Sequence, residues 1–407
     1  MAEWKEYTVA DVISTVIDYR GKTPKKLGGE WGDSGYRALS AKNIKTGKIV
    51  QADSIRYVSE EMYKCWMKEE VQKEDILITS EAPFGQIYYW DSDEKIVLSQ
   101  RLFAVRVNQR FYPKYIYFYM TSSFFQAELD GRATGTTVVG LRQPELLKCK
   151  IFAPDYQEQK RIADTLWCIE QKINNNEAIN NNLEQQAQAI FKSWFVDFEP
   201  FGGVQPPEMK FVPLQELCKV VTKGTTPTTL GKPFTSSGIN FIKAESILDS
   251  HSIDSSKFAF IDEETNALLK RSIIKANDIV FTIAGTLGRF AMVDNSVLPA
   301  NTNQAVAIIR PDENKVTPAY LYSFFIGNWH NEYYSKRIQQ AVQANLSLTT
   351  IKSLPIAVLS NTTMNDYDEL VSPLFALMKG NEEENRRLSE LRDTLLPKLM
   401  SGELDVS

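Results

Sequence analysis

The sequence has few of the residues on which most hydrolytic and metal-dependent enzymes rely. It contains only two histidines, His251 and His330, and four scattered cysteines with no CxxC pair. Zinc sites need clustered imidazoles or thiolates, and nucleophilic catalysis needs a nucleophile beside a base. The composition therefore argues against zinc hydrolysis and histidine-dependent catalysis, and we expect neither a catalytic residue nor a metal site.

Cofactor and nuclease motifs are missing as well. The chain has no GxxxxGK[ST] loop, no Gly-rich cofactor loop after a strand, and no Asn/Asp-Pro-Pro-aromatic turn. The string PDENK at 311–315 has the letters of a nuclease site, but all of them crowd one polar loop. In a nuclease site the first Asp is separated in sequence from the Glu-x-Lys, so that two strands converge on a metal. An enzyme that carries its own modification or cleavage chemistry is disfavoured.

Long hydrophobic runs are also absent. The N-terminal stretch MAEWKEYTVADV has no apolar signal-peptide core, and no later stretch offers the roughly 18 apolar residues that span a bilayer. We expect a cytoplasmic protein with no membrane partner. A length of 407 residues suits two or three domains.

What the chain does have is an internal repeat. Residues 8–24 align with 213–227, and both end in Gly-x-Thr-Pro; residues 74–90 align with 277–293 and pair Asp75 with Asp278. Each copy continues with an apolar strand, an aromatic helix that opens on proline, and a final short strand. This alternation of apolar segments and turn signals predicts one mixed α/β head in each copy.

A long amphipathic helix is expected after each head. Apolar residues recur three and four positions apart in both, with two asparagines at matching places, and Arg392 alone breaks the second register. Coincident asparagines favour duplication and helix pairing, because buried asparagine fixes register at a cost in stability. Two independent surface helices are the alternative. The residues expected to pair the helices are Ile169, Ile173, Asn176, Asn180, Leu183, Leu374, Met378, Asn381, Asn385 and Leu388.

The repeat predicts a fold of two α/β heads joined by a pair of antiparallel coiled-coil helices about a pseudo-twofold axis. The expected boundaries are 1–154 for the first head, 155–199 for the first helix, 200–360 for linker and second head, and 361–407 for the second helix and tail. About 40 helical residues would make a rod on the order of 60 Å. Ser372-Pro373 permits either a helix start there or a kink in a longer helix.

Charge is unevenly distributed along the chain. The net charge is +1 over 1–155, −3 over 156–199, +2 over 200–360 and −5 over 361–407, so the acidity lies in the helices. A basic cluster occupies residues 20–50, and the loops that close each head are polar. Such residues can contact phosphates and bases, although solvated turns look the same. The DNA-contact candidates are Lys22, Thr23, Lys25, Lys26, Lys42, Lys45, Arg132, Thr134, Thr136, Thr137, Arg142, Lys223, Thr225, Thr226, Lys243, Arg289, Gln343, Asn345 and Ser347.

The order of these sequence motifs resembles that in the specificity subunit of type I restriction-modification systems, over essentially the whole chain. The carriers are the two Gly-x-Thr-Pro turns, Asp75-Ile76-Leu77 with Asp278-Ile279-Val280, Pro154 with Glu158-Gln159, and the C-terminal run from Leu395 to Leu404. The second helix departs from the pattern because residues 365–373 lack the Pro and Glu-Gln pair.

The resemblance implies that each head is a target recognition domain that reads one half of a split, asymmetric duplex DNA sequence. It implies that the helices space the heads and dock two methyltransferase subunits, which bring S-adenosylmethionine, and that restriction subunits using ATP and Mg²⁺ join them. This chain would bind no cofactor itself. The main alternative is a coiled-coil adaptor that binds protein without sequence-specific DNA recognition.

Overall fold

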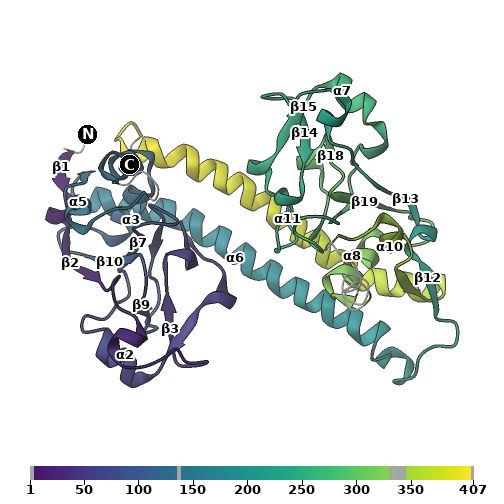
Figure 1. The fold of residues 1–407 in the computed structure, drawn as a ribbon, viewed down its shortest axis with the longest axis horizontal. Coiled ribbons are helices and arrows are strands. Elements are labelled where there is room, and N and C mark those ends of the chain that lie inside the picture. The colour runs from purple at the N-terminus through teal and green to yellow at the C-terminus, as the bar shows by residue number, and fades with distance from the viewer. Residues whose placement is uncertain (1–3, 135–138, 330–332, 334–344, 405–407) are drawn as a thin grey trace. The chain divides into compact units, whose positions relative to one another are not determined.

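The chain folds into two units, each built from one head and a segment of both long helices. The computed structural model describes residues 4–134, 139–329, 333 and 345–404. Unit 1 comprises residues 1–175 and 384–407, and unit 2 comprises residues 176–383 (Figure 1). Head 1 is the part of unit 1 that precedes the first long helix, and head 2 is the part of unit 2 between the two long helices. No helix in the described ranges has a stretch long and apolar enough to cross a bilayer.

The core of head 1 is a four-stranded antiparallel sheet. In spatial order its strands are β2 (Ile13–Asp18), β10 (Leu102–Val107), β7 (Ile76–Thr79) and β8 (Ile87–Tyr89). The two inner strands, β7 and β10, are apolar and buried along most of their length, as continuous hydrophobic runs predict. A second sheet joins β6 (Arg56–Val58), β3 (Tyr36–Leu39) and β9 (Val97–Leu98), and β1 (Lys5–Thr8) pairs with β11 (Lys150–Ala153).

Head 2 repeats these three sheets in the same strand order. Its main sheet has the order β13 (Cys218–Lys223), β19 (Val306–Pro311), β16 (Ile279–Thr282) and β17 (Phe290–Met292). The smaller sheets are β15 (Ala259–Ile261), β14 (Ile239–Ile242) and β18 (Ala300–Thr302), and β12 (Lys210–Pro213) with β20 (Pro355–Val358). The predicted duplication of an α/β head is confirmed.

The repeated aspartate has the same structural partner in both heads. Asp75 is fully buried and accepts two hydrogen bonds from Arg106, both 2.9 Å long. Asp278 is fully buried and accepts two 2.7 Å bonds from Arg310. Burial of the carboxyl raises the pKa of Asp75, and the guanidinium of Arg106 opposes that shift. These aspartates therefore tie the start of one inner strand of each main sheet to the neighbouring strand.

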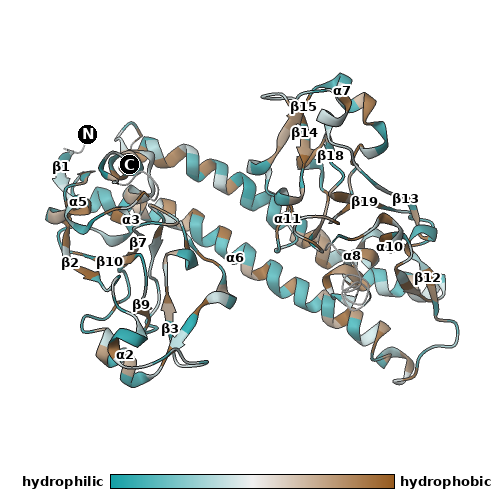
Figure 2. Cartoon of the chain, viewed as in Figure 1, coloured by the Kyte–Doolittle hydropathy of each residue, from teal (hydrophilic) through white to brown (hydrophobic). Residues whose placement is uncertain are grey.

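Each head core continues into the helices beside it. Figure 2 shows hydrophobic positions along both long helices. In unit 1, the aromatic helix α3 (Pro113–Thr121) packs in one cluster with Ile162 and Leu166 of the first long helix and Leu399 of the second. In unit 2, α8 (Pro318–Ile326) packs in one cluster with Phe191 and Phe195 of the first and with four buried residues of the second. Those four residues are Tyr367, Val371, Phe375 and Met378. The long helices are therefore part of both cores.

The first long helix, α6, runs from Tyr156 to Phe195 and the second, α11, from Asn361 to Met400. Asp155 caps α6 by accepting the Glu158 N–H at 3.0 Å, as the Asp-x-x-Glu pattern indicates. α6 ends at Phe195, short of the expected residue 199, because Phe198 takes a positive φ and a 3₁₀ turn follows over Glu199–Phe201. α11 passes through Pro373, so the second helix starts before that proline.

The helices pair in antiparallel orientation through the repeated asparagines. In unit 2, the Asn381 amide donates to the Asn180 side-chain oxygen at 2.7 Å, and the Asn180 amide donates to the Met378 carbonyl at 3.1 Å. In unit 1, the Asn385 amide donates to the Ile173 carbonyl at 3.3 Å. Asn385 and Ile173 are the repeat equivalents of Asn180 and Met378, so each unit makes the same hydrogen bond between its own segments of the two helices.

The residue that breaks the apolar register has a partner on the opposite helix. Arg392 of α11 donates to Glu170 of α6 at 2.9 Å, and the Glu170 side chain is only 9% exposed. The repeat-equivalent pair in unit 2 is Ala187 with Phe375, and both are buried. Sequence periodicity did not identify Glu170, because it lies one position from the expected seam residue Ile169.

Candidate nucleic-acid interface

Three segments that are far apart in sequence meet on head 1. The Leu141 N–H donates to the Ser80 carbonyl and the Ser80 N–H donates to the Arg101 carbonyl, each at 2.9 Å. The Arg20 guanidinium donates to the Leu141 carbonyl at 3.1 Å. The Gly-Lys-Thr-Pro turn, the loop after β7 and the closing loop of the head are thus joined into one surface.

This surface is hollowed by two neighbouring cavities, which we call the head-1 groove. One, of about 540 Å³, is lined by Arg20, Gly21, Thr23, Lys26, Ser80, Glu81, Gln100, Arg101, Thr134, Gly140, Leu141 and Arg142. The other, of about 290 Å³, is lined by Trp31, Ala38, Ser40, Ala41, Lys42, Ser54, Arg56, Ala82, Ser99, Gln100 and Arg101. Gln100 and Arg101 belong to both. Of the predicted contacts, Thr23, Lys26, Lys42, Thr134 and Arg142 lie in this groove.

The head-1 groove is strongly cationic. Six cationic side chains and one carboxylate, Glu81, stand among its described lining residues. The cations are Arg20, Lys26, Lys42, Arg56, Arg101 and Arg142. Glu81 pairs with Arg101 at 2.8 Å, and Arg20 pairs with Asp18 at 2.8 Å outside the groove. The remaining positive charge favours a polyanion.

The groove also carries the groups that read bases. Arginine binds guanine and glutamine binds adenine through paired hydrogen bonds, whereas Ser, Thr and Lys contact phosphates or single base atoms. Arg142 is exposed, and it precedes α5 (Gln143–Leu147). Trp31 has the Arg56 guanidinium over its ring, 5.1 Å from the centroid. These side chains can contact both the base edges and the phosphate backbone of a nucleic acid.

Four other candidates in unit 1 lie outside the groove. Lys22 donates to the Trp66 carbonyl at 2.9 Å, and Arg132 donates to Glu128 at 3.2 Å. Lys25 and Lys45 are exposed but do not line either cavity. The structure thus gives Lys22 and Arg132 intramolecular partners that the sequence did not reveal.

The candidates in the Gly-x-Thr-Pro turn of head 2 lie beside residues from later loops of the head. Thr226 precedes a 3₁₀ turn and donates to Gln304, Thr225 accepts from Arg271 at 3.4 Å, and Lys223 is exposed. Gly224 is buried, and a Cβ there would meet the Thr302 carbonyl at 1.8 Å. The Gly-x-Thr-Pro turn of head 2 therefore requires glycine.

Two basic candidates in unit 2 have structural partners. The ammonium of Lys243 lies 5.1 Å from the ring centroid of Phe234. Arg289 makes two 2.6 Å hydrogen bonds to Asp249, a side chain that is 81% exposed. Both remain near the surface, where a nucleic acid would compete with these partners.

The closing loop of head 2 ends in a helix cap. Ser347 accepts the Thr350 N–H at 3.0 Å and caps α10 (Leu348–Lys352), while Asn345 is exposed. Its capping bond gives Ser347 a structural role. Three predicted contacts, Thr136, Thr137 and Gln343, lie outside the described residues.

Repeat-equivalent positions differ in charge between the heads. Lys42, Arg56 and Arg101 of head 1 correspond to residues without positive charge in head 2. Those residues are Glu245, Ala259 and Ala305. The two heads therefore present different charges at these three equivalent positions.

No sequence pattern pointed to Trp31, Arg56 and Arg101 as groove residues. Arg101 follows Gln100, which marks the repeat, and it adopts a positive φ of 64° that only the structure reveals. Arg56 reaches the groove from β6 through the pairing of β6 with β3. A solitary arginine on a short strand or in a turn carries no sequence pattern that points to a shared surface.

The fold and the groove define a class: a two-headed recognition protein in which paired helices join the heads. Comparison with known families identifies the chain further. The model of the type I restriction modification DNA specificity domain matches residues 1–185 and 206–359, and the chain belongs to this family. The two matches correspond to the two copies of the repeat.

Curated relatives and a solved structure agree with this assignment. The chain is 24% identical to the HindI specificity subunit of Haemophilus influenzae, over 99% of this chain and 100% of the relative. It is 25% identical to the MjaIX specificity subunit of Methanocaldococcus jannaschii, over 82% and 78% of the two chains. The crystal structure of the type I S subunit from M. genitalium matches with a TM-score of 0.60 at 17% identity, over 98% and 96%, and supports the same fold.

Proposed function

We propose that this chain reads one half of a bipartite, asymmetric DNA sequence with each head and contributes no catalysis of its own. Two methyltransferase subunits, with S-adenosylmethionine, dock on the paired helices, and restriction subunits that use ATP and Mg²⁺ complete the assembly in the cytoplasm. The adaptor alternative leaves the cationic groove of head 1 without a role.

The head-1 groove is the observation that carries the proposal. It brings residues from six segments of the chain, between Arg20 and Arg142, to one concave surface whose lining has a large excess of positive charge. Phosphate neutralisation supplies affinity, and the arginine and glutamine side chains at the floor and rim supply sequence preference. The differing charges of head 2 support a second, different half-site.

The most direct test of the groove is Arg142→Ala. We expect the complex with its methyltransferase subunits to bind its target DNA with affinity lowered by about 1–3 kcal/mol if Arg142 contacts a base edge. Arg110→Ala is the matched control, because Arg110 is exposed on the same head but does not line the groove. Fluorescence anisotropy on labelled duplex, repeated over a series of salt concentrations, measures both variants.

This assay distinguishes a base contact of Arg142 from a phosphate contact. Loss of a base contact weakens binding to one half-site and reduces the difference in affinity between target and random DNA. Loss of a phosphate contact weakens binding to all sequences and lowers the slope of log affinity against log salt concentration by about one. Equal affinity of both variants and the parent for target DNA would contradict the assignment of the groove.

A further inference from the structure

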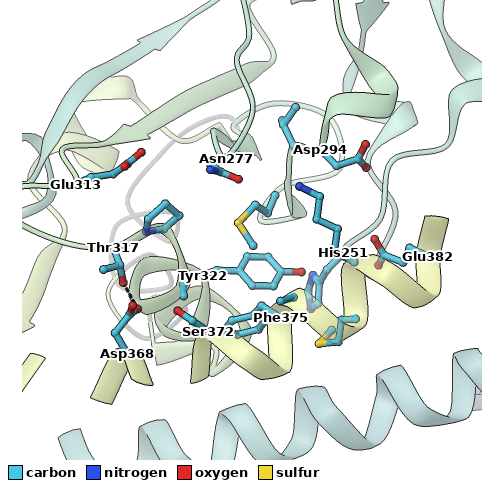
Figure 3. Close-up of a pocket in the computed structure, with 17 residues that line it drawn as sticks. His251, Asn277, Asp294, Glu313, Thr317, Tyr322, Asp368, Ser372, Phe375 and Glu382 are labelled. Atoms are coloured by element: carbon cyan, nitrogen blue, oxygen red, sulfur yellow. Dashed lines mark hydrogen bonds between the residues drawn. The ribbon is translucent and has the colours of Figure 1, made fainter. Parts of the chain in front are cut away.

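Unit 2 contains a cavity of about 430 Å³ between head 2 and α11 (Figure 3). Its volume lies in the range of small-ligand and side-chain pockets. The walls come from the loop at His251, the end of β17, the first turns of α8, and the face of α11 between Asp368 and Glu382. The cavity is separate from the positions equivalent to the head-1 groove.

The base of this cavity is aromatic and apolar. Tyr322 and Phe375 meet edge to face with ring centroids 5.1 Å apart, and both are largely buried. His251 stacks on Phe290 at 4.1 Å on another wall. Met292 and Met378 also line the cavity, and methionine adapts readily to a flat ring.

In unit 1 the equivalent space is filled by the protein itself. Trp167 of α6 packs against Tyr89 at 5.1 Å and against Tyr117 and Phe118 at 6.3 Å, while the Lys114 ammonium lies 4.6 Å from a Trp167 ring centroid. An indole and a cation therefore occupy this place in the first copy of the repeat.

Four of these five positions carry different residues in unit 2. The replacements are Trp167 by Ser372, Tyr89 by Met292, Phe118 by Ser323 and Lys114 by Ala319, while Tyr117 is matched by Tyr322. Ser372, Met292 and Ala319 line the cavity. The second copy thus keeps the aromatic base and lacks both the indole and the cation.

The rim of the cavity is acidic. Among the described residues, four carboxylates and one ammonium line it, and Figure 3 shows the side chains of Asp294, Glu313, Asp368 and Glu382 around the cavity. Asp368 accepts a hydrogen bond from Thr317, which fixes that carboxylate at the rim. A net negative rim over an aromatic base attracts a ring that has a positive charge beside it.

We propose that this cavity binds an aromatic side chain, flanked by lysine or arginine, from a protein partner. The ring takes the place that Trp167 holds in unit 1, on Tyr322 and Phe375. The adjacent cation takes the place of Lys114 and is held by the rim carboxylates. The proposal does not depend on DNA recognition by either head.

The test uses the full chain and the peptide N-acetyl-Lys-Trp-Lys-amide, with tryptamine as a second probe. Titration calorimetry is expected to show saturable binding of one peptide per chain. Ser372→Trp restores the side chain of unit 1, fills the cavity, and lowers peptide affinity about tenfold or more. Leu391→Trp is the matched control, because it adds the same ring at an exposed site of α11 and leaves binding unchanged.

Two further variants keep the result interpretable. Met292→Tyr also restores a unit 1 residue and reports on filling if the tryptophan variant does not fold. Asp294→Asn removes one rim charge and keeps the N-cap, since asparagine caps as well as aspartate, and should weaken binding about threefold.

Three outcomes would overturn the proposal. The first is absence of saturable peptide binding to the parent chain. The second is unchanged affinity in both filling variants. The third is tryptamine binding as tightly as the peptide, which would assign the cavity to a small aromatic amine and not to a protein segment.

Discussion

Two aspartates of head 2 show how burial determines what an arginine pair contributes. Asp278 and Asp249 each accept two hydrogen bonds from one guanidinium, from Arg310 and Arg289 respectively. The Asp278 side chain is 0% exposed and the Asp249 side chain is 81% exposed. A buried charge that loses its partner stays desolvated, whereas an exposed charge regains water.

Replacing each aspartate by asparagine should separate these cases. We expect Asp278→Asn to lower the free energy of unfolding by about 3–5 kcal/mol, because Arg310 is left without a counter-charge at a buried site. Asp249→Asn should lower it by less than about 1 kcal/mol. Urea denaturation measures both, and equal losses would show that burial does not determine the difference.

At the same scale, the sequence located part of the groove and missed the rest. Thr23, Lys26, Lys42, Thr134 and Arg142 stand in turns and closing loops, where polar residues have a pattern. Arg56 and Arg101 follow no such pattern. Arg56 reaches the groove through the pairing of its strand, and Arg101 reaches it in an uncommon backbone conformation. Short-range patterns cannot report contacts that only the tertiary fold creates.

At the scale of elements, the two long helices were predictable because their periodicity is repeated. The paired asparagines lie where the repeat placed them, and Asn180 contacts Asn381 across the two helices. The pairing of Glu170 with Arg392 was not predictable. The periodicity marks Arg392 as an interruption of the apolar positions and does not reveal which residue of the other helix faces it. Only the antiparallel register brings the two together.

Arg392→Ala tests what this pair contributes to the helices. We expect a loss of about 2 kcal/mol in unfolding free energy, between the values for exposed and buried pairs, because Glu170 is nearly buried and Arg392 is not. The double variant Glu170→Phe, Arg392→Ala reproduces Phe375 and Ala187 of unit 2 and should recover most of the loss. Thermal unfolding measures both, and a double variant less stable than the single one would contradict this account.

At the scale of the whole molecule, the duplication of heads and helices was visible in the sequence, whereas the chemistry of each head was not. The proposed spacer role of the helices predicts that inserting four residues after Asn180 and four after Asn385 lengthens the pair by about 6 Å. The preferred gap between half-sites should grow by about two base pairs at roughly 3.4 Å each, with both half-sites unchanged.

The control for this prediction is a four-residue insertion at Gly202-Gly203, an exposed segment that follows α6. It leaves both helices intact and should leave the gap unchanged. Selection of bound duplexes reads out both designs, and altered half-sites with a constant gap would show that the helices do not set the spacing.

The central claim is that two heads read two different half-sites. Selection from a pool of random duplexes, using this chain bound to its methyltransferase subunits, tests it most directly when the parent is compared with Arg101→Ala, Arg142→Ala. The account predicts two short sequence blocks separated by a constant gap, with preference lost in one block only in the variant. A single block, no preference, or equal loss in both blocks would contradict it.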